Sequence, residues 1–129
     1  MKRISLLKTL TIALLLFFGM SLSFGQVLSA GDIAIIGVGV DDEKILLVAL
    51  ADIPSGESVF FTDDEWDGSA FNTGEGFYEW VTPTINAGTV LTLTTSSTSA
   101  GGTVIHRVGS FALLNSGDGF FLYQTSTNI

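Results

Sequence analysis

The chain has 129 residues and contains no cysteine. This absence excludes a disulfide scaffold, a thiol nucleophile, a cysteine-ligated zinc site and a lipidated N-terminal cysteine. About a hundred residues is room for one small domain with one core. Without disulfides, such a domain has to depend on its packed core, on flanking domains or on a bound ion.

Positive charge is scarce beyond the first residues. Lys2, Arg3 and Lys8 are three of the five basic residues, whereas all 13 Asp and Glu come after residue 25. Residues 26–129 therefore carry two basic and 13 acidic side chains, a net charge of −11, against −8 for the whole chain. A surface this acidic repels phosphate groups, which argues against nucleic acid and anionic membranes as partners.

Residues 1–25 have the three-part pattern of a signal peptide. A nearly pure apolar run, residues 10–18 (LTIALLLFF), follows the basic residues, and Ser23 and Gly25 are the small residues before a cut at Gln26. A retained anchor is the alternative, but a spanning helix needs about 20 mostly apolar residues, and polar residues dilute the second half of this segment. We expect export through the Sec pathway, cleavage, and no membrane contact afterwards.

The remainder, residues 26–129, has the period of two that is typical of strands. Seven short segments rich in β-branched and aromatic residues are separated by turn-forming residues, and no window has the pattern of a capped helix. The run at 45–51 (ILLVALA) is continuous and apolar, which predicts a strand buried on both faces. The sequence therefore predicts an all-β fold, an antiparallel sandwich of about seven short strands. The predicted strands are 33–40, 45–51, 58–62, 77–82, 89–95, 103–108 and 119–124.

Two stretches repeat one pattern. Residues 53–62 and 85–94 both consist of Ile-x-x-Gly followed by a strand that ends in threonine. We expect Gly56 and Gly88 to adopt the positive φ that a type II turn requires. Two copies do not make a repeat array, so we interpret them as two edges of the sandwich that use the same turn.

Several turns and strands occur in a suggestive order: 31–37 (GDIAIIG), 52–56 (DIPSG), 61–66 (FTDDEW), the turn at 87–88 and 110–118 (SFALLNSGD). In this order they resemble bacterial lamin-tail-like domains, over nearly all of residues 30–124. The Phe-x-Leu-x-Asn-Ser-Gly-Asp turn is the most specific part. The resemblance implies an immunoglobulin-like β-sandwich, of the kind that accompanies extracellular nucleases, phosphatases and surface proteins as a non-catalytic module.

The signal peptide and this module together look like the N-terminus of cargo exported by type IX secretion. Such cargo normally carries a C-terminal sorting domain, and none is visible before Ile129. The chain also stops just after a predicted strand. We therefore expect it to be part of a longer protein, whose flanking domains or cell-surface material would be its partners.

The sharpest local feature is an acidic loop after the third predicted strand. Asp63, Asp64, Glu65 and Asp67 place four carboxylates in five residues. Calcium takes about six to eight oxygen ligands, so these residues are candidate Ca²⁺ ligands, with a solvated loop as the alternative. The spacing partly matches the calcium loop of an EF-hand, but Gly74 stands where the last glutamate ligand belongs.

Aromatic residues gather around the same loop. Trp66 and Phe71 lie within it and are candidate ligand-binding residues, since exposed rings can stack on sugar faces. The strand that follows is different, because large rings supply much of the core of a small domain. Phe77 and Trp80 are therefore predicted to pack in the core or at its edge, with Tyr78 on the same strand face as Trp80.

Nothing marks a catalytic centre. His106 is the only histidine. A histidine base would need an activated hydroxyl nearby, and the sequence contains no G-x-S-x-G motif that would mark a nucleophilic serine. Strand alternation places His106 on one face with Val104 and Val108, which predicts partial burial and a structural role. Glu75 and Glu79 could form a glycosidase-type pair, but a domain of this size leaves little room for a substrate cleft.

We therefore predict a secreted or cell-surface, non-catalytic module with a structural, adhesive or accessory role in a larger exported protein. One alternative is a calcium-dependent polysaccharide-binding module that uses Trp66, Phe71 and the acidic loop. The other is an accessory domain of an extracellular hydrolase such as a nuclease, with the chemistry supplied elsewhere.

Overall fold

The computed structural model describes residues 28–114 and 117–124, so the predicted signal peptide and its cleavage site lie outside the described residues. Within these ranges the structure contains strands and no helix, and hence no helix long and apolar enough to cross a membrane. The strands lie where the alternation of the sequence predicts them. They are β1 (Ile33–Gly39), β2 (Lys44–Ala49), β3 (Ser58–Thr62), β4 (Phe77–Val81), β5 (Val90–Leu93), β6 (Thr103–Val108) and β7 (Phe121–Tyr123).

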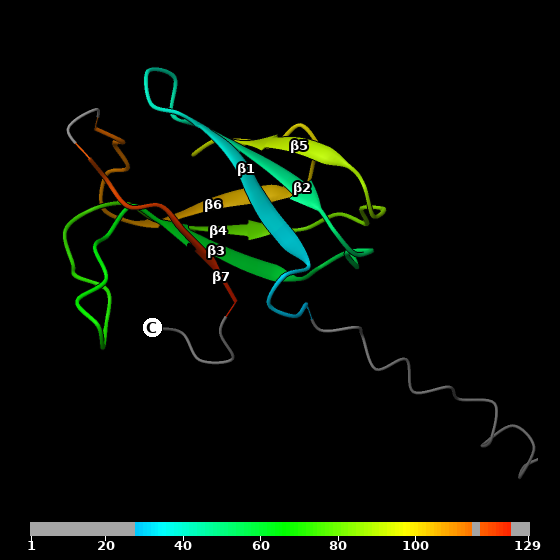
Figure 1. The fold of residues 1–129 in the computed structure, drawn as a ribbon, viewed down its shortest axis with the longest axis horizontal. Coiled ribbons are helices and arrows are strands. Elements are labelled where there is room, and N and C mark those ends of the chain that lie inside the picture. The colour runs from blue at the N-terminus through cyan, green and yellow to red at the C-terminus, as the bar shows by residue number, and fades with distance from the viewer. Residues whose placement is uncertain (1–27, 115–116, 125–129) are drawn as a thin grey trace, which may run out of the picture.

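The strands form two sheets, one over the other (Figure 1). One sheet has the order β1-β2-β5 and the other the order β6-β4-β3-β7, and every pair of neighbouring strands is antiparallel. The predicted antiparallel sandwich of seven strands is thus confirmed for the described part of the chain. Each sheet ends in two edge strands, and β1 and β7 are two of them.

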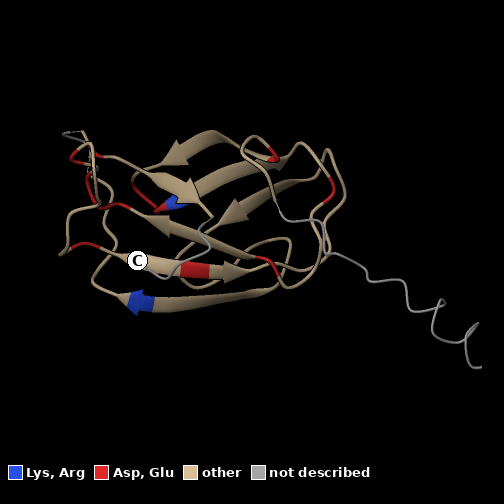
Figure 2. Ribbon diagram, turned by 90° about the horizontal axis from the view of Figure 1, so that it is seen from below, with Lys and Arg blue, Asp and Glu red and all other residues tan. Residues whose placement is uncertain are grey.

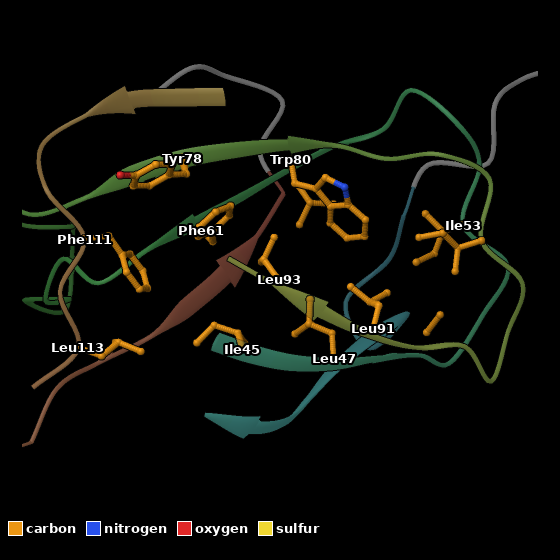
Figure 3. Packing of buried hydrophobic residues seen from close by; sticks show 13 residues of the cluster. Ile45, Leu47, Ile53, Phe61, Tyr78, Trp80, Leu91, Leu93, Phe111 and Leu113 are labelled. Atoms are coloured by element: carbon orange, nitrogen blue, oxygen red, sulfur yellow. The ribbon is translucent and has the colours of Figure 1, made fainter. Parts of the chain in front are cut away.

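The core fills the space between the sheets, where side chains of β2 and β5 meet those of β3 and β4 (Figure 3). Trp80 is fully buried, and its indole N–H donates to the carbonyl oxygen of Gly101 at 3.1 Å. Tyr78 lies on the same face and stacks on Phe61, with ring centroids 5.2 Å apart. The predicted core position of Trp80 and its shared face with Tyr78 are therefore confirmed. Each such side chain stabilises the fold by about 1.5–3 kcal/mol relative to exposure. Phe77, the other ring predicted at the core or its edge, is half-buried, lies outside the core cluster and stacks on Phe60.

The prediction that residues 45–51 are buried on both faces is wrong. Ile45, Leu47 and Ala49 point into the core, but Leu46 between them is 38% exposed. The reason is the architecture: β2 is the middle strand of a sheet whose outer face has no second layer over it among the described residues. The continuous apolar run thus forms a strand with one buried face.

The two similar stretches of sequence lie against each other. The backbone N–H of Ile53 donates to the oxygen of Ile85 at 2.8 Å, and the reverse bond is 2.9 Å long. Gly56 and Gly88 have φ values of +90° and +83°, as the turn pattern predicts. The repeated turn precedes β5, an edge strand, and β3, which lies between β4 and β7, so the interpretation as two edges is right only for β5.

Candidate functional site

The long connection between β3 and β4, residues 63–76, contains all the site residues that the sequence predicts; we call it the 63–76 loop. Its tip is a small hairpin in which Trp66 and Phe71 form an antiparallel bridge. Asp67 turns the chain there, because its Oδ1 accepts the N–H groups of Ser69 at 2.7 Å and Ala70 at 2.8 Å. These bonds lower the pKa of Asp67. An aspartate that binds the backbone two or three residues on is a turn former.

Asp63 is a buried clamp at the base of this loop. Its side chain is almost inaccessible, at 1% exposure. One carboxylate oxygen accepts the N–H of Gly76 at 2.7 Å, and the other accepts the N–H of Ala112 at 2.7 Å. A buried carboxylate is stable only when such bonds replace its water. Asp63 therefore joins the two ends of the loop to the segment that follows β6.

Asp64 is also buried and also holds the backbone. Its Oδ1 accepts the N–H of Glu75 at 3.1 Å, and its own N–H donates to the hydroxyl oxygen of Thr62 at 3.0 Å. Glu65, by contrast, is exposed, and its Oε2 lies 3.4 Å from the side-chain amide of Asn72. The four acidic residues therefore divide into two buried and two exposed.

This arrangement does not supply the oxygen cage that the calcium prediction requires. Among residues 28–114 and 117–124, no group of three or more His, Asp or Glu is arranged to hold a metal ion. The oxygens of Asp63 accept hydrogen bonds from backbone N–H groups. A cation bound to these oxygens would lie close to the partial positive charge of the N–H hydrogens and would be repelled. The alternative prediction, a solvated acidic loop, is wrong for Asp63 and Asp64, because both are buried. Calcium binding stays a prediction that these contacts do not favour.

Trp66 and Phe71, the predicted ligand-binding pair, do lie together. Their rings meet edge to face at 5.0 Å between centroids. Phe71 is half-buried because it stacks on Tyr123 of β7 at 5.0 Å, whereas Trp66 is 49% exposed at the outer side of the pair. The hairpin thus packs on the outer face of the four-stranded sheet and leaves Trp66 partly exposed to solvent.

The hairpin rests on a group of rings that the sequence reasoning missed. Phe60 and Phe77 stack at 5.5 Å, and Phe60 contacts Tyr123 at 6.0 Å. Alternation could have found them, since neighbours such as Phe60 and Phe61 must point to opposite faces of one strand. The pKa of Tyr123 is raised by burial and by the charge of Asp64. We call this group the outer aromatic cluster: Phe60, Trp66, Phe71, Phe77, Phe121 and Tyr123.

Glu75 and Glu79, the other candidate carboxylates, have different surroundings. Glu79 is 6% exposed and accepts the hydroxyl hydrogen of Ser58 at 2.5 Å, while Arg107 forms an ion pair with its other oxygen. The Ser58 hydroxyl and Arg107 lower the pKa of Glu79. Desolvation and then the charge of Asp63 raise the pKa of Glu75. Several of the acidic residues lie in loops at the ends of the sandwich (Figure 2). Glu79 therefore stabilises the four-stranded sheet, by bonding Ser58 of β3 and Arg107 of β6.

His106 is exposed, so the predicted partial burial is wrong. It lies on β6, an edge strand of the four-stranded sheet. Its Nε2 is 2.8 Å from the carbonyl oxygen of Gly109 and must donate there, because that oxygen can only accept. The ring also contacts Tyr78, with centroids 5.0 Å apart.

The described residues define an all-β, two-sheet sandwich whose acidic side chains mostly brace its own loops. The chain matches no protein-family model, no curated protein and no solved structure. The resemblance to lamin-tail-like domains therefore rests on the turn-and-strand segments of the sequence.

Proposed function

We propose that this chain is a secreted or cell-surface, non-catalytic module of lamin-tail-like, immunoglobulin-like type. Its role is structural, adhesive or accessory within a larger protein exported by type IX secretion. Its partners are flanking domains of that protein or cell-surface material. The signal-peptide pattern and the two-sheet sandwich support this proposal.

The observation that most supports the proposal is the hydrogen bonding of the Asp63 carboxylate. In an active or metal site, a carboxylate presents an oxygen to the substrate or the ion. Both oxygens of Asp63 instead receive backbone N–H groups, at 2.7 Å each. The most buried acidic group of the molecule thus holds a loop in place, which is what a scaffold requires.

A polysaccharide-binding module is the second candidate, because the exposed indole of Trp66 is held in a fixed orientation. Phe71 contacts the indole edge to face, and the backbone of the hairpin is closed by the bond from the N–H of Asn72 to the oxygen of Glu65 at 2.8 Å. A preformed aromatic surface loses little entropy when it binds. The contacts favour this sugar-binding role without calcium.

Export is tested with the full chain in a Gram-negative host. We expect the mature protein outside the cytoplasm, with Gln26 as its first residue by mass spectrometry. A variant with Leu14→Arg and Leu15→Arg, which interrupts the apolar run, should stay unprocessed inside the cell. An intact N-terminus on cytoplasmic wild-type protein would contradict the proposal of a secreted module.

Sugar binding is tested by retention of the exported protein on insoluble glycans. Trp66→Ala should abolish retention while the melting temperature stays close to that of the wild type. Val90→Ala is the matched control, since Val90 is also exposed (59%) but lies on β5, away from the hairpin. Equal retention of the wild type and Trp66→Ala would remove polysaccharide binding from consideration and leave the structural role.

A further inference from the structure

One side of the sandwich is open, between β1 and β7. Both are edge strands of their sheets, and they do not pair with each other. They run along the same side of the molecule, as Figure 1 shows. A cavity of about 350 Å³ lies between them and is lined by Ile33 from β1 and by Leu122 and Tyr123 from β7.

A second cavity, of about 410 Å³, lies further along β1. It is lined by Ile35 and Val38 of β1 and by Phe120, just before β7. Ile33 and Ile35 are alternate residues of β1, and Phe120 lies two residues before Leu122 of β7, so the two cavities follow one another along both segments. β1 has seven residues, so the groove is on the order of 20 Å long at the rise of a strand. We call it the β1–β7 groove.

Apolar side chains of the core reach into this groove and stay partly uncovered. Ile35 is 42% exposed and Val38 is 48% exposed, although both belong to a strand of the sandwich. Further apolar residues pack against the core from the same side without being fully buried: Leu28, Ile33, Val40, Phe120 and Leu122. The groove is therefore a place where one more layer of apolar side chains would complete the core.

A strand suits this groove better than a lipid or a compact ligand. Among residues 28–114 and 117–124, no strand pairs with the edge of β7 that faces away from β3, so this edge can accept a further strand. β1 is the poorer edge, because a register shift between Ile35 and Gly37 interrupts it. An added strand on β7 would direct alternate side chains into the groove.

The charge around the groove indicates which kind of strand would bind there. Asp32 lines the first cavity and Asp118 lines the second, so each end of the groove carries a carboxylate. Residues 26–129 carry only Lys44 and Arg107 as basic groups against 13 acidic ones. A second copy of this chain would meet like charge, whereas a strand with basic ends would be attracted.

We propose that the β1–β7 groove binds an extended peptide strand of another protein or domain, apolar at alternate positions and basic at both ends. This strand pairs with the free edge of β7 and covers the exposed side chains of β1. The inference depends on the described groove and not on export. A chain shown to remain in the cytoplasm would overturn the proposed function and leave this inference standing.

The experiment titrates the full chain, in amide NMR at low salt, with a nine-residue peptide of alternating valine and threonine that has a lysine at each end. We expect saturable shifts at the amides of β7 and of residues 33–35. A peptide with a central proline lacks a ladder donor and should not bind. A peptide with glutamate ends should bind about tenfold or more weakly than the lysine peptide.

Two variants locate the site. Ile35→Lys places a charge in the groove and should weaken binding of the lysine peptide about tenfold or more, as should Val38→Lys if the first variant fails to fold. Val90→Lys adds the same charge at an exposed position of β5 and should bind as the wild type does. Three results would each overturn the proposal. They are equal binding of all three peptides, equal loss in Val90→Lys, and self-association of the free chain that shifts the same amides.

Discussion

The guanidinium of Arg107 on β6 pairs with the carboxylate of Glu79 on the neighbouring strand β4. The two partners differ in exposure: the side chain of Arg107 is 46% exposed and that of Glu79 only 8%. Arg107 is the only arginine after residue 25, and it lies beside the one acidic residue within a strand of the four-stranded sheet. The positive charge of Arg107 offsets part of the free-energy cost of burying the Glu79 carboxylate.

Arg107→Ala should destabilise the domain by about 1–2 kcal/mol, because Glu79 keeps only the Ser58 hydroxyl as a partner. Solvent at the exposed arginine keeps the loss below that of a fully buried pair. Urea unfolding of the wild type, Arg107→Ala, Glu79→Gln and the double variant forms a cycle that isolates the pair. A coupling energy near zero would show that the ion pair contributes nothing.

The same carboxylate predicts a loss of stability in acid. Its folded pKa is lowered from the ordinary 4.5 by the Ser58 hydroxyl and Arg107. Its contribution is therefore fully present above that ordinary pKa and is lost as the pH falls through the lowered folded value. Unfolding curves measured from pH 7 to pH 2 should show a smaller acid loss in Glu79→Gln than in the wild type. Equal slopes in both proteins would contradict this assignment.

Asp63→Ala should be more damaging than any change at an exposed acidic residue. It leaves the N–H groups of Gly76 and Ala112 without their acceptor, at about 1–3 kcal/mol for the buried donor of Gly76 and less for that of Ala112, which is an exposed residue. The loop should also open, which hydrogen exchange at Gly76 would detect. Asp41→Ala is the control, because Asp41 is exposed, and it should change stability by less than about 0.5 kcal/mol. Similar losses in both variants would mean that Asp63 is no clamp.

Millimolar CaCl₂ should leave the melting temperature unchanged. The oxygens of Asp63 and Asp64 already accept hydrogen bonds, so a cation would have to break these bonds to bind. Calorimetry with CaCl₂ and with chelator is the measurement, and MgCl₂ at equal ionic strength controls for screening. A rise with calcium alone that disappears in Glu65→Gln with Asp67→Asn would restore the predicted calcium site.

Strand positions could be predicted because they depend on local alternation and on the turns between strands. Gly56 and Gly88 are good examples, since their positive φ follows from the turn pattern alone. The run at Leu46 misled the prediction, because an apolar residue does not reveal whether a second layer will cover it. Periodicity describes one strand, whereas burial depends on the whole sheet.

The site was harder to predict for the same reason. Asp63 is one of five acidic residues in the 63–76 loop, and what distinguishes it is the hydrogen bond from the N–H of Ala112, 49 residues away in sequence. Only the assembled sandwich brings that donor to it. The outer aromatic cluster likewise joins Phe71 to Tyr123, which come from distant parts of the chain. Residue types predict the candidates, and long-range contacts decide their roles.

Gly109 is the position where the close approach of two segments should tolerate no side chain. It has a φ of +73°, and a Cβ atom there would run into the carbonyl group of Glu75 at the end of the 63–76 loop. Gly56 has a similar φ of +90° but open space around it. Gly56→Ala should therefore cost only the backbone strain of about 1–2 kcal/mol.

Gly109→Ala should cost about 1–3 kcal/mol more, because packed backbone has to move apart as well. The displaced carbonyl belongs to Glu75, whose N–H donates to Asp64, so the variant should also weaken the hold on the loop. Chemical denaturation of both variants gives the difference, and the fluorescence of Trp66 in the hairpin reports on loop movement. Because Trp80 is also fluorescent, Trp80→Phe in both backgrounds isolates the signal of Trp66. Equal destabilisation by the two substitutions would show that left-handed strain, and not contact with Glu75, requires a glycine at residue 109.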